Sequence, residues 1–297
     1  MRWSGLILLI LVLAACGGSA GAPALATDPP LATVPAATLA AADSHPAATA
    51  TPAAVDPTAA APTAASVAGS TSADAPLETG GERAGEALTF EGAEGVPIQA
   101  TLYKPQGQGP FPGVTLLHML GGERGVWAEA GLVDALVEAG YAALAIDMRG
   151  HGQTGGEDDW ALAGEDLALV WDAFMARADV DEARSAVVGA SIGANLALRL
   201  AAARPEIRGA VLLSPGLDYR GVTTEDALAD YGERPLFLLA SGDDEYAADS
   251  AAVLNSVAMG ETEFGLFADA GHGTDMFAAE PELPALIVGW LDQHLGQ

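Results

Sequence analysis

The pattern of apolar and polar positions divides this chain into two unlike parts. From residue 86 onward, short apolar runs alternate with longer segments whose apolar residues recur at helical spacing, whereas residues 17–85 show neither period. The short runs predict strands at Ala87–Glu91, Ile98–Lys104, Gly113–His118, Ala142–Asp147, Ser185–Gly189, Gly209–Ser214, Pro235–Ala240 and Thr262–Phe267. Such alternation predicts an α/β fold, in which helices cover both faces of a mainly parallel, doubly wound sheet.

The segments between these strands predict helices at Trp127–Ala139, Trp160–Ala176, Ile192–Ala203, Glu245–Ala258 and Glu282–His294. Only residues 215–234 separate two of the later strands, which leaves room for a loop and one short helix, Thr223–Tyr231. We therefore expect residues 86–297 to form a single domain without a large cap. Ligands of such sheets bind beyond the carboxyl ends of the strands, so those ends are where chemistry is expected.

The first fifteen residues have the pattern of a secretory signal peptide. Arg2 supplies a positive charge, and residues 5–15 form an apolar run that is too short to span a bilayer, which takes about 20 residues. The stretch Leu13-Ala14-Ala15-Cys16 resembles the lipobox of bacterial lipoproteins. The resemblance implies that a lipid on Cys16 holds the protein on the cell membrane, outside the cytoplasm. The alternative is an ordinary signal peptide with an incidental cysteine.

Residues 16–85 are expected to form a tether behind Cys16. Ala, Pro and Thr dominate this stretch, as in Ala59-Ala60-Ala61-Pro62-Thr63. A segment of this composition buries too little apolar surface to offset the entropy of ordering it, and its prolines favour an extended spacer. We therefore expect a disordered stalk between the anchor and the folded domain.

Charge and cysteine content exclude several classes of protein. The formal net charge is −28, from 12 basic and 40 acidic residues. So acidic a surface repels phosphate backbones, which argues against nucleic-acid binding, and it favours neutral or cationic small molecules over anionic ones. Cys16 is the only cysteine, so the chain has neither an intrachain disulfide nor a Cys/His ligand set. We expect no metal and no cofactor.

One pentapeptide at a strand end carries the strongest chemical signal. Gly189-Ala190-Ser191-Ile192-Gly193 ends a predicted strand and opens the helix Ile192–Ala203, which is the setting of a nucleophile elbow. The turn is too tight for side chains two residues either side of the serine, which explains both glycines. At a helix N-terminus, free amides stabilise a developing oxyanion. We expect Ser191 to be a nucleophile. The alternative is a close-packed glycine turn with an idle serine.

A serine hydroxyl needs a base to accept its proton, and position selects among five histidines. His45 lies in the expected tether, and His294 lies on a helix face. His118 ends an earlier predicted strand, and His151 follows another. His272, flanked by glycines, directly follows the last strand, from where its imidazole can swing over the sheet edge toward the serine. We expect His272 to be the base.

The base in turn needs a carboxylate, which fixes its tautomer and stabilises the imidazolium. Asp243 and Asp244 both follow the strand Pro235–Ala240, and Asp218 follows the preceding strand. We prefer Asp244, because a helix is predicted to start directly after it, and Asp243 and Asp218 remain alternatives. The resulting chain order of Ser, Asp and His is the order found in α/β-hydrolases.

Four strand-end motifs together resemble the α/β-hydrolase superfamily over residues 86–297. They are His118–Gly122, Asp147–Gly152, the Ser191 elbow and Gly271–Gly273. Within that superfamily, the compact size resembles lidless esterases and dienelactone-hydrolase-like proteins. True dienelactone hydrolases use a cysteine nucleophile, whereas this chain has Ser191 and no cysteine in the domain.

The resemblance also implies roles for loop residues. It assigns the oxyanion hole to the backbone amides of Leu120 and Ile192, and it makes Arg149 and His151 loop-bracing groups. The chain departs from the superfamily at Met119, where glycine is usual after the histidine.

These features predict a serine hydrolase. We expect a carboxylesterase that acts on small or exposed esters through an acyl-enzyme. One alternative is a serine peptidase of the prolyl-oligopeptidase type, although the chain lacks the large accessory domain of that group. Another is a binding lipoprotein that keeps the fold without catalysis.

Overall fold

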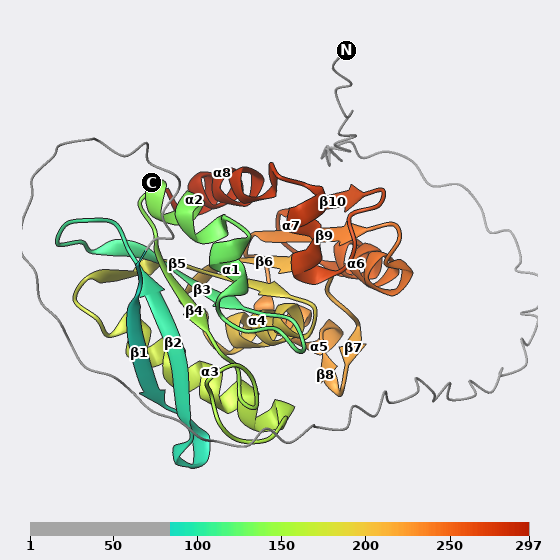
Figure 1. Cartoon of the computed structure of the whole chain (residues 1–297). Helices are drawn as coiled ribbons and strands as arrows, with labels where there is room; N and C mark the ends of the chain where they lie inside the picture. The colour runs from blue at the N-terminus through green and yellow to red at the C-terminus, as the bar shows by residue number, and fades with distance from the viewer. Residues whose placement is uncertain (1–83, 297) are drawn as a thin grey trace, which may run out of the picture. The chain divides into compact units, whose positions relative to one another are not determined.

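The computed structural model describes residues 84–296, which fold around one eight-stranded sheet (Figure 1). Its strand order is β1-β2-β4-β3-β5-β6-β9-β10. The pairs β1/β2 and β2/β4 are antiparallel, and every pair from β4 to β10 is parallel. The strands are β1 (Glu86–Glu91), β2 (Pro97–Tyr103), β3 (Phe111–Leu117), β4 (Ala142–Ile146), β5 (Val180–Ala190), β6 (Ile207–Leu213), β9 (Leu236–Ser241) and β10 (Thr262–Phe267).

Helices cover both faces of the sheet, as the sequence predicts. One group packs on one face and comprises α3 (Trp160–Met175), α4 (Ile192–Ala203), α5 (Glu225–Tyr231) and α6 (Glu245–Val257). The other group packs on the opposite face and comprises α1 (Val126–Glu129), α2 (Leu132–Glu138), α7 (Met276–Ala279) and α8 (Leu283–Leu295). Short 3-10 turns precede β2, at Ala93–Gly95, and α7, at Gly273–Asp275.

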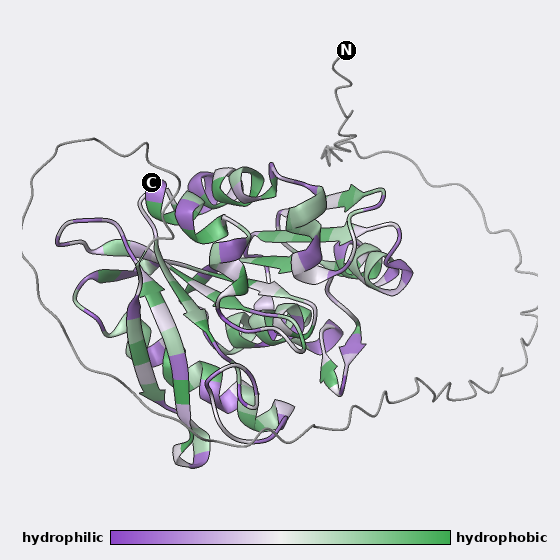
Figure 2. Cartoon of the chain, viewed as in Figure 1, coloured by the Kyte–Doolittle hydropathy of each residue, from purple (hydrophilic) through white to green (hydrophobic). Residues whose placement is uncertain are grey.

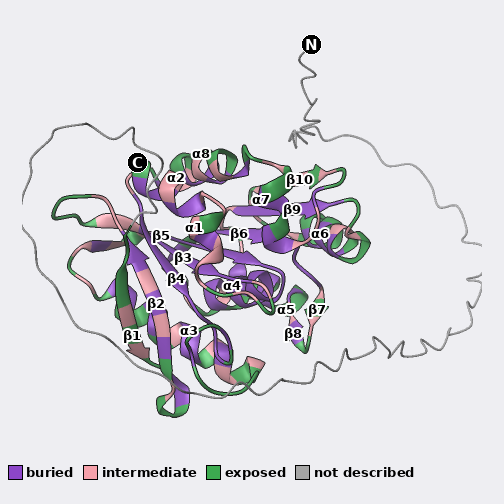
Figure 3. Ribbon diagram, viewed as in Figure 1, coloured by how far each residue is buried: buried purple, intermediate pink, exposed green. Residues whose placement is uncertain are grey.

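Two hydrophobic cores form because side chains alternate along each strand. In β3, Leu116 enters the core under α2 and α8, while its neighbour Leu117 enters the core under α3 and α4. Ala145 and Ile146 divide in the same way in β4. Strand β4 is buried along its whole length, and in β6 only Arg208 is exposed, so the centre of the sheet is apolar (Figure 2) and buried on both sides (Figure 3). The predicted mainly parallel, doubly wound sheet is confirmed.

Two predicted elements differ in detail. The segment Trp127–Ala139 is not one helix but two, because Gly131 has a φ of 74° and this left-handed residue ends the first helix before α2 begins. The strand expected at Ser185–Gly189 starts earlier, at Val180, and passes an irregularity between Ser185 and Ala186. This strand also ends at Ala190, one residue beyond the expected Gly189 and directly before Ser191.

The segment after β6 contains a hairpin that the sequence pattern does not reveal. Strands β7 (Asp218–Tyr219) and β8 (Val222–Thr223) pair antiparallel across Arg220 and Gly221, whose φ angles are 54° and 85°. Two consecutive left-handed residues are what a tight two-residue hairpin turn requires. This hairpin and α5 are the elements between β6 and β9, so no large cap covers the strand ends.

The predicted signal peptide at residues 1–15, Cys16 and the predicted tether up to residue 83 lie outside the described residues. Within residues 84–296, no helix combines the length and apolar character needed to cross a membrane.

Candidate active site

Ser191 occupies a strained turn between β5 and α4. Its backbone has φ 55° and ψ −122°, outside the regions that a non-glycine residue normally adopts. A Cβ on Gly189 would lie 2.2 Å from the carbonyl oxygen of Gly193, and a Cβ on Gly193 would lie 2.3 Å from the carbonyl oxygen of Leu117. Glycine is therefore required at both positions. The turn is further fixed by the Ser191 amide, which donates to the carbonyl oxygen of Leu213 at 2.8 Å.

The structure brings Ser191, His272 and Asp244 into one hydrogen-bonded chain. The Ser191 hydroxyl lies 2.7 Å from Nε2 of His272, and Nδ1 of His272 lies 2.5 Å from Oδ2 of Asp244. The carboxylate can only accept, so it places a proton on Nδ1 and leaves Nε2 free to accept from the hydroxyl. The His272 side chain is 38% exposed and that of Asp244 only 17%, so the base meets solvent while its carboxylate is sheltered.

The two neighbouring carboxylates have different partners. Asp244 precedes α6, and its Oδ1 accepts from the amide of Ala247 at 3.4 Å while its Oδ2 faces His272. Asp243 turns to the other side, where it accepts from the Ser241 hydroxyl and from the amide of Gly271 at 3.2 Å. These bonds, the one from Ser241 first, hold the pKa of Asp243 below its ordinary value.

The third candidate carboxylate, Asp218, lies in the hairpin after β6. Its Oδ1 accepts from the amide of Gly221 at 2.7 Å and so closes the hairpin turn. Of the three carboxylates, Asp244 therefore contacts His272, whereas Asp243 and Asp218 accept hydrogen bonds from backbone amides.

Two serines that the sequence reasoning missed hold the loop that carries His272. The Ser214 hydroxyl accepts from the amide of Gly273 at 2.9 Å, and the Ser241 hydroxyl accepts from the amide of Ala270 at 2.7 Å. Ser214 itself has a left-handed φ of 49°. Both serines end or follow a strand of the parallel sheet, at the same edge as the predicted site residues. Their position at strand ends is the feature of the sequence that could have identified them.

The expected oxyanion loop follows β3, next to the elbow. The amide of Gly122 donates to the carbonyl oxygen of Met119 at 3.0 Å, which closes a turn around Leu120. Ile192, the other expected donor, is the first residue of α4, where helix amides point away from the helix. The Met119 sulfur lies 3.0 Å from the position of a Cβ on Gly273, so its side chain fills the space between this loop and the His272 loop.

His118 links the loop after β3 to the loop after β4. Its Nδ1 lies 2.7 Å from the carbonyl oxygen of Met119, and its Nε2 accepts from the amide of Met148 at 3.1 Å. This pairing needs the neutral imidazole with the proton on Nδ1. Burial, the largest cause, together with His151 lowers the pKa of His118 to about 4, against smaller opposing effects of the Met119 hydrogen bond and of Asp147.

The loop after β4 is braced by buried ion pairs. Arg149 donates to Asp166 through Nε at 2.8 Å, and the hydrogen bonds that it donates to this carboxylate raise the pKa of Arg149. Asp147 pairs with Arg124, which stands in the loop after β3. His151 lies 2.9 Å, through Nδ1, from the carbonyl oxygen of Arg149. These contacts lock the two loops beside the elbow together.

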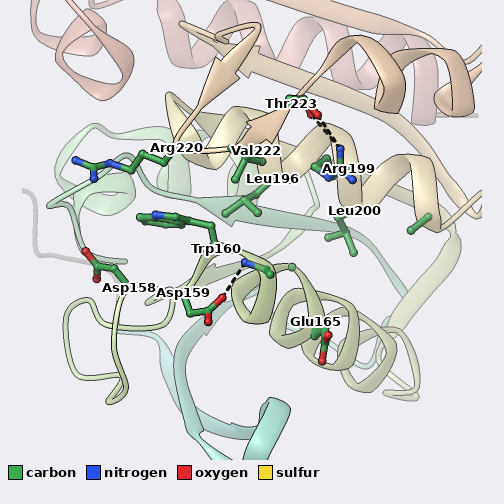
Figure 4. Close-up of a pocket in the computed structure, with 14 residues that line it drawn as sticks. Asp158, Asp159, Trp160, Glu165, Leu196, Arg199, Leu200, Arg220, Val222 and Thr223 are labelled. Atoms are coloured by element: carbon green, nitrogen blue, oxygen red, sulfur yellow. Dashed lines mark hydrogen bonds between the residues drawn. The ribbon is translucent and has the colours of Figure 1, made fainter. Parts of the chain in front are cut away.

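A hollow of about 700 Å³ is lined in part by residues 220–223 of the hairpin (Figure 4). Apolar side chains of α4 form part of its wall, and Trp160 and Arg220 contribute from the start of α3 and from the hairpin turn. Neither Ser191 nor His272 lines it. The hairpin therefore borders this hollow and also contacts His272 through the ring of Tyr219.

Comparison with known proteins supports the reading of the fold. The model of a family described as serine aminopeptidase, S33, matches residues 110–229. An uncharacterized protein of Mycobacterium tuberculosis is 31% identical over 132 residues, which are 44% of this chain and 46% of that protein. The chain thus matches less than half the length of this curated relative.

Solved structures of hydrolases have the same architecture. An acetyl xylan esterase from Paenibacillus superposes with a TM-score of 0.61 at 20% identity, over 70% of this chain and 83% of that one. An esterase from Pyrococcus furiosus gives 0.60 at 18%, over 71% and 91%. A dienelactone hydrolase from Anabaena variabilis gives 0.58 at 20%, over 72% and 100%. Together with the sheet order and the elbow, these similarities establish that the chain has the α/β-hydrolase fold.

Proposed function

We propose that this protein is a serine esterase that cleaves small or exposed carboxylic esters through an acyl-enzyme. The observation that carries the proposal is the hydrogen-bonded chain from Ser191 through His272 to Asp244, beginning at a strained elbow on a helix N-terminus. A disused site has no physical reason to keep a non-glycine residue at φ 55° with a base 2.7 Å away.

The proposed reaction has two stages. His272 accepts the proton of Ser191 as the oxygen attacks the ester carbonyl, and the charge that develops on the carbonyl oxygen is stabilised by the amides of Ile192 and Leu120. The alcohol then leaves with a proton from His272. Water, deprotonated by the same histidine, releases the acid and regenerates the hydroxyl.

Reaction with a fluorophosphonate probe tests this proposal. The wild type is expected to be labelled at one site and to hydrolyse p-nitrophenyl esters, whereas Ser191→Ala loses both activities. Ser256→Ala is the matched control, because that hydroxyl lies in α6 and donates to the carbonyl oxygen of Val253. A wild type that neither labels nor turns over any ester would support the alternative of a non-catalytic binding protein.

A second candidate is a serine peptidase, which the description of the matching family favours. The open strand ends suit a peptide as well as an ester, since no large cap restricts access. Matched ester and amide derivatives of the same amino acid separate the two. We expect the ratio of kcat/KM for the ester to kcat/KM for the amide to be far larger than the ratio of their uncatalysed hydrolysis rates. A ratio close to that of the uncatalysed rates would favour the peptidase.

We also propose that Cys16 carries a lipid that holds the enzyme on the outer side of the cell membrane. The lipobox-like sequence before Cys16 supports this proposal. Several acyl chains anchor far more firmly than one, because each buried CH₂ adds about 0.8 kcal/mol. Metabolic labelling with a fatty-acid analogue, comparing wild type with Cys16→Ser, tests it, and equal incorporation in the two would contradict it.

A further inference from the structure

Tyr219 stands beside the proposed nucleophile although no sequence motif selects it. It is the second residue of β7, in the hairpin that follows β6. Its ring meets the ring of His272 edge-on, with centroids 6.2 Å apart and planes at 89°. Its hydroxyl donates to the carbonyl oxygen of Ser214, and the preceding residue, Leu213, accepts from the amide of Ser191. Tyr219 therefore packs against the proposed base, and its hydroxyl binds the strand end next to the elbow.

The structure holds this ring in place from two sides. Tyr246 packs against Tyr219 at 5.5 Å, and its hydroxyl accepts from the amide of Asp218 at 3.0 Å and lies 2.9 Å from the carbonyl oxygen of the same residue. On the other side, a Cβ on Gly216 would lie 2.6 Å from the Tyr219 ring, so glycine is needed there to admit it. Tyr219 is thus fixed by packing rather than left mobile on a loop.

The O–H group of Tyr219 makes only a long hydrogen bond. It donates to the carbonyl oxygen of Ser214 at 3.3 Å, whereas O–H···O bonds are usually 2.5–3.0 Å long. Burial, followed by the charge of Asp244, raises the pKa of Tyr219, so the phenol keeps its proton at neutral pH. A fixed, protonated donor with a poor partner can turn to a better acceptor when one arrives.

The strand order of the sheet indicates which substrate atom would accept a hydrogen bond from the Tyr219 hydroxyl. β5 lies between β3 and β6, so Ser191 stands between the loop after β3 and the loop after β6. The proposed oxyanion donor Leu120 is on the β3 side, whereas Tyr219 is on the β6 side and next to His272. The carbonyl oxygen points to the first side. The oxygen that departs from the tetrahedral carbon must be near Nε2 of His272, which protonates it.

We propose that Tyr219 is a further catalytic residue, whose hydroxyl donates a hydrogen bond to the leaving-group oxygen during acylation. The bond between the carbonyl carbon and this oxygen breaks, the electron pair stays on the oxygen, and His272 supplies the proton. Tyr219 keeps its own proton throughout and only stabilises the charge on the departing oxygen. This inference rests on the proposed esterase activity.

Tyr219→Phe tests the proposal with two esters of the same acid, an ethyl ester and a p-nitrophenyl ester. Ethoxide needs the hydrogen bond more than p-nitrophenolate, which delocalises its own charge. We expect kcat/KM for the ethyl ester to fall about tenfold more than that for the p-nitrophenyl ester, the loss that one hydrogen bond explains. The phenylalanine keeps the ring packing against Tyr246, and the melting temperature is expected to change little.

Tyr141→Phe is the control, because that hydroxyl donates to Asp292 at 2.8 Å, away from the strand ends. Its ratio between the two esters is expected to equal that of the wild type. An active Tyr219→Phe enzyme with an unchanged ratio would overturn the role of Tyr219 alone. A wild type inactive on both esters would instead overturn the proposed function and this role with it.

Discussion

At the scale of single residues, two adjacent carboxylates have different hydrogen-bond partners because the backbone directs their side chains differently. Asp243 and Asp244 are chemically identical, yet one accepts from the amide of Gly271 and the other from Nδ1 of His272. Asp244 precedes α6, so the helix start fixes the direction of its side chain. Only Asp244 can orient the imidazole, so substitutions at the two positions test which carboxylate acts on His272.

Replacing each of these carboxylates should therefore have unequal effects. Asp244→Asn is expected to lower kcat by roughly 10³- to 10⁴-fold, because the amide favours the wrong tautomer of His272. Asp243→Asn keeps its contact with the His272 loop through an amide oxygen and is expected to cost less than tenfold. Steady-state kinetics on a p-nitrophenyl ester measure both. Equal losses, or a larger loss in Asp243→Asn, would contradict this assignment.

At the scale of elements, the site depends on loops that are tied to one another. His118 connects the loop after β3 to the loop after β4, and Ser214 connects the end of β6 to the loop after β10. The elbow presses against the end of β3 at Gly193. The strand ends are thus held in register by hydrogen bonds and close contacts rather than by a cap.

The buried imidazole of His118 should make stability depend on pH. Its pKa is about 4 in the folded state and about 6.5 in the unfolded state, so acid favours the unfolded chain. The group costs no stability above about pH 7, and its cost grows as the pH falls from 6.5 toward 4. Urea unfolding at pH 7 and pH 5 is expected to show the wild type losing about 2 kcal/mol more than His118→Asn. Equal losses would contradict it.

Two glycine substitutions test the close packing at the elbow. Gly193→Ala puts a methyl group 2.3 Å from the carbonyl oxygen of Leu117, a backbone atom that cannot turn aside, and should destabilise the fold by about 3 kcal/mol. Gly164→Ala is the control, because no atom lies within 4 Å of its added Cβ in α3. It should stabilise the fold by up to about 1 kcal/mol. Thermal melts that ranked the two variants the other way would refute this packing argument.

At the scale of the whole molecule, the sequence predicts the architecture well because the strands and helices that form the core each have a recognisable local pattern of apolar residues. Helix α4 has the predicted bounds, and β6 spans Ile207–Leu213 where the apolar run predicted Gly209–Ser214. Strand ends then collect Ser191, Asp244 and His272 at one edge of the sheet. These patterns are local in the sequence, and the parallel sheet brings them together.

The parts that the sequence does not predict depend on long-range contacts or on single dihedral angles. The break at Gly131 and the hairpin turn at Arg220 each rest on residues in the left-handed region, which apolar periodicity does not report. Ser214, Ser241 and Tyr219 matter only because the fold brings them to a loop far away in the sequence. No local pattern distinguishes them from other serines and tyrosines.

The charge of the whole chain should also influence substrate choice. With a net charge of −28, the protein attracts cations and repels anions over distances that salt shortens. For a cationic and an anionic ester of equal length, the ratio of kcat/KM is expected to fall about three- to tenfold between 0.01 and 0.5 M salt. A ratio that does not change with salt would show that the net charge plays no part in substrate capture.

The central claim is that Ser191 forms a covalent acyl-enzyme. Rapid acid quenching after mixing with a p-nitrophenyl ester, followed by mass spectrometry of peptides, tests it most directly. We expect the peptide that contains Ser191 to be heavier by one acyl group, and the corresponding peptide of Ser191→Ala to be unmodified. Turnover with no acyl group on that peptide, or an acyl group elsewhere that Ser191→Ala retains, would contradict it.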